Sequence, residues 1–398
     1  MTAAHRHDRS LRVLVAHPGA ELFGSDRMLV ESVAGLRAAG HSVLVTVPND
    51  GPLLPVLRAA GASVRIDATP VLRKSFLTPR GLIALAARAT TALFSGLRLT
   101  LRARPDIIFV NTLTIPVWLV VGRLSGRPVI CHVHEAERSA GLLLRRGLAA
   151  PVLLADTIVT NSRFSADVLD DAFSALGRRT TIVHNGIAGP DRLSPAREEL
   201  VGALRVLYVG RLSDRKGVDL AIAAIARLQS DGIPAELEIV GSVFAGNEEF
   251  EAGLHRQVED AGLDDSVRML GFQSDVWSAY ERCDVAVVPS RVDEPFGNTA
   301  VEAVLAGRPV VVSDTSGLRE AASGFESAQH VRPGDADSIA TALRRVHDEW
   351  AHFRSAAFRD RLMAAQRHSP EAYRTRICEA VDATAGGRTW KAADAIGT

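Results

Sequence analysis

The chain of 398 residues alternates short, uniformly apolar runs with stretches in which apolar residues recur every three or four positions. In the stretch after the first run, Leu29, Val33 and Leu36 fall on one helical face. The short runs are apolar throughout, which is typical of parallel strands covered on both faces. The pattern therefore predicts an α/β architecture. The first set of strands is expected at residues 11–16, 42–47, 63–66, 106–110, 128–133, 156–160 and 181–183.

The alternation is interrupted once and then restarts. Residues 185–195 are rich in Gly, Pro, Asp and Ser, as in a linker. Because a second set of strands follows, we predict two Rossmann-like domains, over residues 1–187 and 188–370. A helix within 371–398 is expected to pack back toward the first domain. The second set of strands is expected at residues 204–209, 236–240, 267–270, 285–288 and 309–313.

Composition excludes several classes of protein. The 46 basic and 46 acidic residues cancel, so a nucleic-acid partner is not expected. Three cysteines without a C-x-x-C pair predict neither a disulfide framework nor a zinc site. The polar N-terminus lacks the apolar core of a secretory signal, and apolar runs such as residues 115–121 are shorter than the roughly 20 residues of a membrane span. We therefore expect a cytoplasmic enzyme.

The strongest local signal follows the strand at residues 285–288. Gly297 breaks the structure just before Asn298, which we expect to cap a helix. The amides of the first helical turn would then point out of the sheet edge and suit an anion. Glu294 lies in the loop, and Glu302 lies on the helix, about 6 Å along its axis from Asn298. Taken alone, this run also fits a surface helix that carries two glutamates.

A second signal follows the strand at residues 204–209. Arg211 and Lys216 lie between that strand and the next helix, and Lys216 is one of only three lysines in the chain. Arginine offers planar, bidentate contacts to phosphate, and lysine offers a mobile point charge. We expect the pair at the carboxyl edge of the second sheet, where a diphosphate would lie. An exposed charged turn is the alternative, since the spacing is not that of a P-loop.

Two weaker signals follow strands of the first set. Gly19 and Gly24 allow a close approach of backbone to a ligand after the first strand, although the loop matches neither common phosphate-binding glycine motif. His132 and His134 alternate along the chain and so share a face, as a metal pair would. Because no further ligand cluster accompanies them, we expect no metal. One of the two histidines is predicted to face the cleft as a hydrogen-bond donor.

Taken together, these motifs resemble glycosyltransferase family 4, a family of retaining nucleotide-sugar transferases. The resemblance covers nearly the whole chain, and its most specific part is the match of Glu294 and Glu302 to the family's E-x7-E motif. It implies the GT-B fold, in which two Rossmann-like α/β domains face each other across a cleft. Further matches, in the expected order, lie at residues 184–187, 209–212, 216–217, 306–311 and 317–320.

The resemblance implies a role for each matched position. Glu302 would hold the ribose of a nucleotide-diphosphate sugar, and Glu294 would contact the donor sugar. Arg211 and Lys216 would neutralise the diphosphate in place of a metal, so no metal or other cofactor is expected. His134 resembles the family's cleft histidine, which contacts the donor sugar. The remaining donor contacts are expected from Gly24, Ser25, Gly271, Phe272, Phe296, Gly297, Asn298 and Thr299.

The implied function is retaining transfer of a hexosyl group to a hydroxyl acceptor, in the biosynthesis of a cell-surface glycan, glycolipid or polysaccharide. Negative charge builds on the departing phosphate, and fixed cations and amides in a dry cleft stabilise it. A sugar-nucleotide epimerase or hydrolase on the same fold is one alternative, and a non-catalytic two-lobed binding protein is another. Asp335 and Asp337 match the D-x-D metal motif of other glycosyltransferases, but here we expect Asp335 to cap a helix.

One charged segment predicts a further partner. Residues 71–105 carry seven basic side chains and no acidic one, interleaved with Leu, Ile and Phe. A basic amphipathic helix of this kind suits an anionic bilayer, and a solvated helix of an Arg-rich protein is the alternative. We therefore predict peripheral contact with the inner face of the membrane and a membrane-associated or lipid-linked acceptor.

Overall fold

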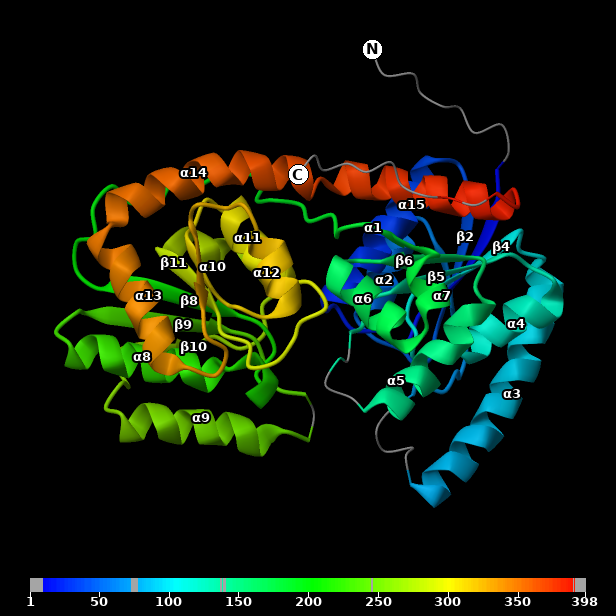
Figure 1. The fold of residues 1–398 in the computed structure, drawn as a ribbon, viewed down its shortest axis with the longest axis horizontal. Helices are drawn as coiled ribbons and strands as arrows, with labels where there is room; N and C mark the ends of the chain where they lie inside the picture. The colour runs from blue at the N-terminus through cyan, green and yellow to red at the C-terminus, as the bar shows by residue number, and fades with distance from the viewer. Residues whose placement is uncertain are drawn as a thin grey trace, which may run out of the picture. The chain divides into compact units, whose positions relative to one another are not determined.

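The computed structural model describes residues 10–72, 78–136, 138, 141–244, 246–388 and 390. The chain forms two compact units (Figure 1). Unit 1 comprises Met1–Gly186 with Pro370–Thr398, and unit 2 comprises Ile187–Ser369. Each unit contains one parallel sheet with helices on both faces, which confirms the predicted α/β fold with two Rossmann-like domains.

The sheet of unit 1 has seven parallel strands in the order β3-β2-β1-β4-β5-β6-β7. Its central strands are buried along their whole length, in agreement with their uniformly apolar sequences. The chain reverses its direction of winding between the neighbours β1 and β4. The strands are β1 (Arg12–Ala16), β2 (Ser42–Val47), β3 (Ser63–Ile66), β4 (Ile107–Val110), β5 (Val129–Val133), β6 (Thr157–Thr160) and β7 (Thr180–Ile182).

Helices form two layers on this sheet. One face is covered by α1, α2 and the C-terminal helix α15, and the other mainly by α3, α4, α6 and α7. Helix α15 packs closely on α1, because a Cβ at Gly35 would lie 2.8 Å from Cβ of Arg374. The helices are α1 (Gly24–Ala38), α2 (Leu53–Ala59), α3 (Pro79–Ala103), α4 (Val117–Ser125), α5 (Leu142–Ala149), α6 (Arg163–Ala172), α7 (Ser174–Gly177) and α15 (Pro370–Ala385).

Unit 2 repeats the plan with six parallel strands in the order β10-β9-β8-β11-β12-β13. Helices α8, α9 and α13 cover one face, and α10, α11 and α12 the other, while α14 contributes to both cores. The strands are β8 (Leu204–Val209), β9 (Ala235–Val240), β10 (Val267–Met269), β11 (Val285–Val288), β12 (Val310–Ser313) and β13 (Ala328–Val331). The helices are α8 (Val218–Ser230), α9 (Glu248–Asp260), α10 (Trp277–Arg282), α11 (Asn298–Leu305), α12 (Ser316–Ala322), α13 (Ala336–Asp348) and α14 (Trp350–Arg367).

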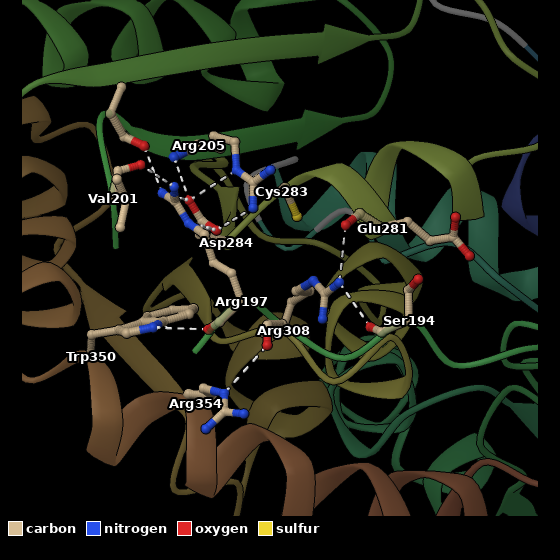
Figure 2. Close-up of polar contacts among 12 residues, drawn as sticks. Ser194, Arg197, Val201, Arg205, Glu281, Cys283, Asp284, Arg308, Trp350 and Arg354 are labelled. Carbon is tan, nitrogen blue, oxygen red and sulfur yellow. Dashed lines mark hydrogen bonds and ion pairs between the residues drawn. The ribbon is translucent and has the colours of Figure 1, made fainter. Parts of the chain in front are cut away.

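The buried carboxylate of Asp284 holds in place the segment that precedes β8 in unit 2. The Asp284 side chain is fully buried just before β11 and accepts hydrogen bonds from two arginines, with Arg197 Nη2 at 2.6 Å and Arg205 Nη2 at 2.8 Å (Figure 2). The carbonyl of Arg197 in turn accepts a hydrogen bond from Trp350 Nε1 at 3.2 Å. Strands β8 and β11 and helix α14 are therefore tied to the segment that precedes β8.

Arg308 anchors the same segment from the other side. Its side chain is buried, and its Nε donates to the carbonyl of Tyr280 at 2.9 Å. Its Nη2 donates to the carbonyls of Ser194 at 3.0 Å and Glu281 at 3.1 Å (Figure 2). Burial lowers the pKa of this guanidinium. Residues 187–195, most of the segment expected as a linker, belong to unit 2, and Arg308 holds the carbonyl of Ser194 within it.

The three cysteines are buried free thiols, at Cys131, Cys283 and Cys378. Burial raises the pKa of all three, to about 12 for Cys283 and Cys378. Because the thiolate is the reactive species, these side chains are unreactive in the folded chain.

Replacement of Asp284 by Ala is expected to lower the free energy of unfolding of unit 2 by about 3 kcal/mol, because it leaves two arginines without their buried partner. Urea unfolding, with the transition assigned to unit 2 by hydrogen exchange in β8 and β11, measures the loss. The control is Glu326→Ala, which removes an exposed partner of Arg359 and should cost at most about 1 kcal/mol. Equal losses in the two variants would contradict the anchoring role.

Candidate functional site

The charged motifs of unit 2 meet at one edge of its sheet. Residues 210–217 follow β8, and residues 289–297 follow β11, its neighbour in the sheet. Because both strands are parallel, their carboxyl ends lie together, and β8 and β11 are the pair at which the winding direction changes. Open α/β sheets bind ligands outside such a point.

The structure pairs two residues that the sequence singled out separately. Lys216 Nζ lies 2.7 Å from Glu294 Oε2, and Ser290 Oγ donates to Glu294 Oε1 at 2.8 Å. Both carboxylate oxygens of Glu294 are therefore engaged, and its side chain is mostly buried. The ammonium of Lys216 keeps donors for a further ligand, since it has three N–H bonds.

An arginine that the sequence analysis passed over clamps the two loops together. Arg291 donates to both carboxylate oxygens of Asp219, with Nη1–Oδ1 at 2.6 Å, and its backbone N–H donates to the carbonyl of Arg215 at 2.9 Å. Asp219 lies in the first turn of α8, the helix that follows the loop after β8. The ion pair therefore ties the loop after β11 to α8. This ion pair raises the pKa of Arg291.

Two glycines let the backbone of these loops approach more closely than a side chain would allow. A Cβ at Gly217 would lie 2.1 Å from the carbonyl oxygen of Pro289, and one at Gly317 would lie 2.1 Å from that of Glu294. Next to Gly317, Ser316 donates through its backbone N–H and its hydroxyl to Asp293, at 3.2 and 2.8 Å. The loop after β11 is thus bounded on both sides by backbone.

Helix α11 begins at this loop, but its cap differs from the expectation. Asn298 is the first residue of the helix, and Gly297 occupies the cap with φ 137°, a conformation in which a side chain would be strained. Phe296 is buried in the core and packs against His368, so only its backbone is available to a ligand. Thr299 and Glu302 lie half-buried in the first turns of the helix.

The other predicted donor contacts of unit 2 lie on neighbouring loops. The guanidinium of Arg211 stacks on the ring of Phe244, 3.5 Å from its centroid, and the carbonyl of Arg211 accepts a hydrogen bond from Tyr208 at 2.7 Å. Gly271 follows β10 with φ 67°, and its carbonyl accepts from the loop after β9. Phe272 is half exposed beside it. Arg211 and Lys216, which the sequence pattern treats as a pair, therefore contact different side chains. Arg211 contacts Phe244, and Lys216 contacts Glu294.

The predicted residues of unit 1 also lie at the carboxyl edge of their sheet. Helix α1 begins at Gly24, followed by Ser25, and the Asp26 carboxylate accepts from the backbone N–H of Phe23 at 2.8 Å. His134 follows β5 and is buried. These positions lie around β1, β4 and β5, at the point where the winding of this sheet changes.

A hydrogen-bonded chain reaches His134 through residues that the sequence analysis did not select. Asp26 Oδ1 lies 2.7 Å from His17 Nε2, His17 Nδ1 lies 3.1 Å from Asn111 Nδ2, and Asn111 Oδ1 lies 3.0 Å from His134 Nε2. The amide nitrogen of Asn111 can only donate, so His17 Nδ1 accepts and its proton is on Nε2. The amide oxygen can only accept, so His134 carries a proton on Nε2.

This chain changes the expectation for His134. Its Nε2–H is donated to Asn111, so the hydrogen-bond donor predicted for a ligand is used inside the unit. Burial lowers the pKa of His134 well below its ordinary value, and nearby His132 and His17 add to the effect. The ring is therefore neutral, and Nδ1 holds a lone pair that can accept a hydrogen bond.

His132 lies against His134, with ring centroids 4.0 Å apart, as expected from their shared face. Neither ring nitrogen of His132 has a hydrogen-bond partner among the described residues, and burial lowers its pKa to about 3. Glu135 follows His134 in the chain. Its carboxylate accepts hydrogen bonds from the Thr112 hydroxyl and from the backbone N–H of His134, the latter at 3.1 Å. Burial raises the pKa of this carboxyl.

The D-x-D pattern has the structural role expected of it. The Asp335 carboxylate caps α13 by accepting from the backbone N–H of Ser338 at 3.0 Å. Within the part of the chain that the structure describes, no three or more His, Cys, Asp and Glu side chains are grouped as metal ligands would be.

Two family models match the chain. The family described as "Glycosyl transferases group 1" matches residues 194–362, which lie in unit 2. The family described as "Glycosyltransferase Family 4" matches residues 24–188, which lie almost entirely in unit 1. The first match contains the carboxyl edge of unit 2, and the second contains Gly24, Asn111 and His134 of unit 1 but begins after β1.

Individual relatives and a solved structure are also similar to this chain. The chain is 29% identical over 387 residues to the glycogen synthase of Mycobacterium tuberculosis, covering 89% of this chain and 90% of that protein. It is 28% identical over 331 residues to the 2-deoxystreptamine glucosyltransferase of Streptomyces kanamyceticus, covering 75% and 83%. The structure of HepE (Alr3699) from Anabaena in complex with UDP-glucose matches with a TM-score of 0.78 at 22% identity, covering 94% and 100%. At that identity the structural likeness shows the fold.

The ring state of the two buried histidines can be measured directly. We expect His132 and His134 to stay neutral between pH 7.5 and 5, because burial penalises the charged form. The unfolded chain binds a proton at each below about pH 6.5, so acidification there should favour unfolding by up to about 1.4 kcal/mol per pH unit for each histidine. NMR titration of the ring resonances tests this, with the urea-unfolded chain as control. Protonation of either ring near pH 6.5 in the folded chain would contradict the assignment.

Proposed function

We propose, from the premise that this chain is a GT-B glycosyltransferase of the family 4 kind, that it moves a hexosyl group from a nucleotide-diphosphate sugar to a hydroxyl acceptor with retention. The observation that carries the proposal is the Lys216–Glu294 pair at the carboxyl edge of unit 2, beside the N-terminal end of α11. A cation, a carboxylate and a helix N-terminus suit a diphosphate joined to a sugar.

The negative charge that develops on the leaving group determines which protein side chains and amides the site needs. As the bond to the sugar breaks, negative charge grows on the β-phosphate. Lys216 is assigned to this charge, together with Arg211 and the backbone amides of residues 296–299. The sharing of Lys216 with Glu294 fixes the ammonium before the donor arrives. Because the groups are already oriented, little reorganisation is needed during the reaction.

Glu294 and Glu302 are assigned to different parts of the donor. Glu294 is held by Lys216 and Ser290, which leaves it positioned to accept from hydroxyls of the donor sugar. Glu302, about one turn along α11, is assigned to the ribose hydroxyls. Gly271 and Phe272 are assigned to the base, since a half-exposed ring offers a stacking face.

Unit 1 is proposed to contribute a neutral histidine ring. His134 presents Nδ1 as an acceptor, because Asn111 holds its Nε2–H, and we assign it to a hydroxyl of the donor sugar. Gly24 and Ser25 at the start of α1 are assigned to the phosphate and sugar. The acceptor is proposed to be a carbohydrate or lipid-linked hydroxyl, in line with relatives such as a glycogen synthase and a lipopolysaccharide 1,2-N-acetylglucosaminetransferase.

Thermal-shift measurements with UDP, GDP, ADP and their sugars separate the two glutamates. Glu302→Ala is expected to lose the shift caused by the nucleotide, because it removes the ribose contact. Glu294→Ala should keep that shift and lose at least about 100-fold in turnover, since its contacts are with the sugar. Glu326→Ala, on an exposed surface, is the control. Equal nucleotide binding by Glu302→Ala and the unaltered protein would refute the ribose assignment.

Replacement of Lys216 by Ala is expected to lower kcat about 10²- to 10³-fold, because a fixed cation at the leaving phosphate is lost. Lys216→Arg should recover part of the rate. We also propose that no divalent ion takes part, so excess chelator should leave the rate unchanged. Silencing by chelator, or full activity of Lys216→Ala, would contradict the proposed stabilisation. Turnover of donor at the same rate without acceptor would instead favour a hydrolase.

A further inference from the structure

Helix α3 exposes three large apolar side chains along one side. Ile83, Phe94 and Leu101 are 73%, 69% and 73% exposed, although each is a large apolar side chain. They are separated by 11 and 7 residues, close to three and two helical turns, so they lie on one side of the helix. We call these three residues the α3 stripe. Scattered exposed apolar residues are common, but three aligned along one helix form a patch that favours a partner.

The opposite side of α3 is already occupied by its own unit. Ala92, Gly96 and Leu99 are buried, and a Cβ at Gly96 would lie 2.8 Å from the Val121 side chain on α4. Figure 1 shows α3 along the outer edge of unit 1, and residues of α3 and α4 share one hydrophobic core. The α3 stripe therefore faces away from the core and has no role in packing the unit.

Arginines flank the stripe along its length. Arg80, Arg88, Arg98 and Arg102 are exposed, and none of the four forms an ion pair with the described residues of the chain. Arg80 lies three residues before Ile83, and Arg98 three before Leu101, so these side chains are neighbours on the helix surface. No acidic residue occurs between Asp67 and Asp106. The partner of this face must accept apolar side chains and supply negative charge.

We infer that α3 lies flat on an anionic lipid bilayer, with the α3 stripe in the acyl boundary and the four arginines among the lipid phosphates. This is the arrangement of an amphipathic interfacial helix. It gives the predicted membrane contact of residues 71–105 a defined face, while Arg73 and Lys74 lie outside the described residues. The inference is independent of the proposed reaction.

Helix α3 is also long and apolar enough to cross a membrane by length and composition, contrary to the expectation from uninterrupted apolar runs. Two features favour a surface position. The helix connects β3 to β4 and packs on α4, so it cannot leave its unit without breaking the core. Its four arginines are spread over its length, and a spanning helix would bury charge near the bilayer centre.

A second exposed apolar group provides a matched control. Phe358 and Leu362 on α14 of unit 2 are 54% and 61% exposed, but they lie among charges of both signs, including the Arg359–Glu326 ion pair. A surface of mixed charge lacks the attraction to an anionic bilayer. Substitutions at these two positions therefore test whether exposed apolar residues in general are sufficient.

Flotation of the full chain with vesicles is the first test. We expect binding to vesicles of phosphatidylcholine with 30% phosphatidylglycerol, weakening with salt, and no binding to phosphatidylcholine alone. Ile83→Ser/Phe94→Ser/Leu101→Ser should abolish binding, and each Arg→Gln change at the four arginines should weaken it about fivefold. Phe358→Ser/Leu362→Ser should bind as the unaltered protein does. Thermal unfolding confirms that each variant is folded.

Three results would overturn the inference: no binding to the anionic vesicles at low salt, equal weakening by the stripe and α14 variants, or a lipid-free dimer that the stripe variant converts to monomer.

A label on the helix gives a position-specific measurement. Because the native thiols are buried, Phe94→Cys and Phe358→Cys can each be labelled selectively with a polarity-sensitive dye. The label at position 94 should report an apolar environment on anionic vesicles, and the label at 358 should not. Identical responses from the two labels would also contradict the inference.

Discussion

The site of unit 2 depends on the contact of backbone with backbone around one loop. The carbonyl oxygens of Pro289 and Glu294 lie only 2.1 Å from where a Cβ of Gly217 and of Gly317 would be. The loop after β11 therefore fits closely between the loop after β8 and the start of α12. Any side chain at either glycine would have to move this loop. The position of the Glu294 side chain, and with it the Lys216 contact, follows from that fit. The Arg291–Asp219 ion pair then holds the loop in register with α8.

The two units present different electrostatic surfaces at corresponding edges. In unit 2 the charges are paired, Lys216 with Glu294 and Arg291 with Asp219, so Lys216, the cation proposed for the diphosphate, is already oriented. In unit 1 the ring of His134 is uncharged, because burial lowers its pKa. A charged leaving group is best stabilised at the first surface, and an uncharged sugar is best oriented at the second. The division of labour in the proposed reaction follows from this difference.

The sequence predicts most of the fold, because strands buried on both faces must be apolar throughout. It also places the motifs after the correct strands, since βα loops of parallel sheets share one edge. The linker expected at residues 185–195 shows what composition misses: Arg308 and Asp284 anchor this region and the segment that follows it through contacts with residues distant in sequence. The helix cap assigned to Asn298 shows a second limit. Gly297 takes that position because its backbone conformation disfavours any side chain.

The side-chain partners within each site lay beyond the sequence pattern. Asp26, His17 and Asn111 are ordinary polar residues until the neighbouring strands β1 and β4 bring them together, and only their geometry fixes the tautomer of His134. The periodicity of a helix also does not show which of its apolar side chains are exposed. The sequence predicts a basic amphipathic helix within residues 71–105, but it does not separate the apolar residues that pack on the unit from those that stay exposed, and the structure has both a buried face and an exposed stripe. Since the core needs only the first, the second requires an explanation outside the folding of unit 1. The arginines beside it form no ion pair with the described residues, and they specify the charge of the proposed partner.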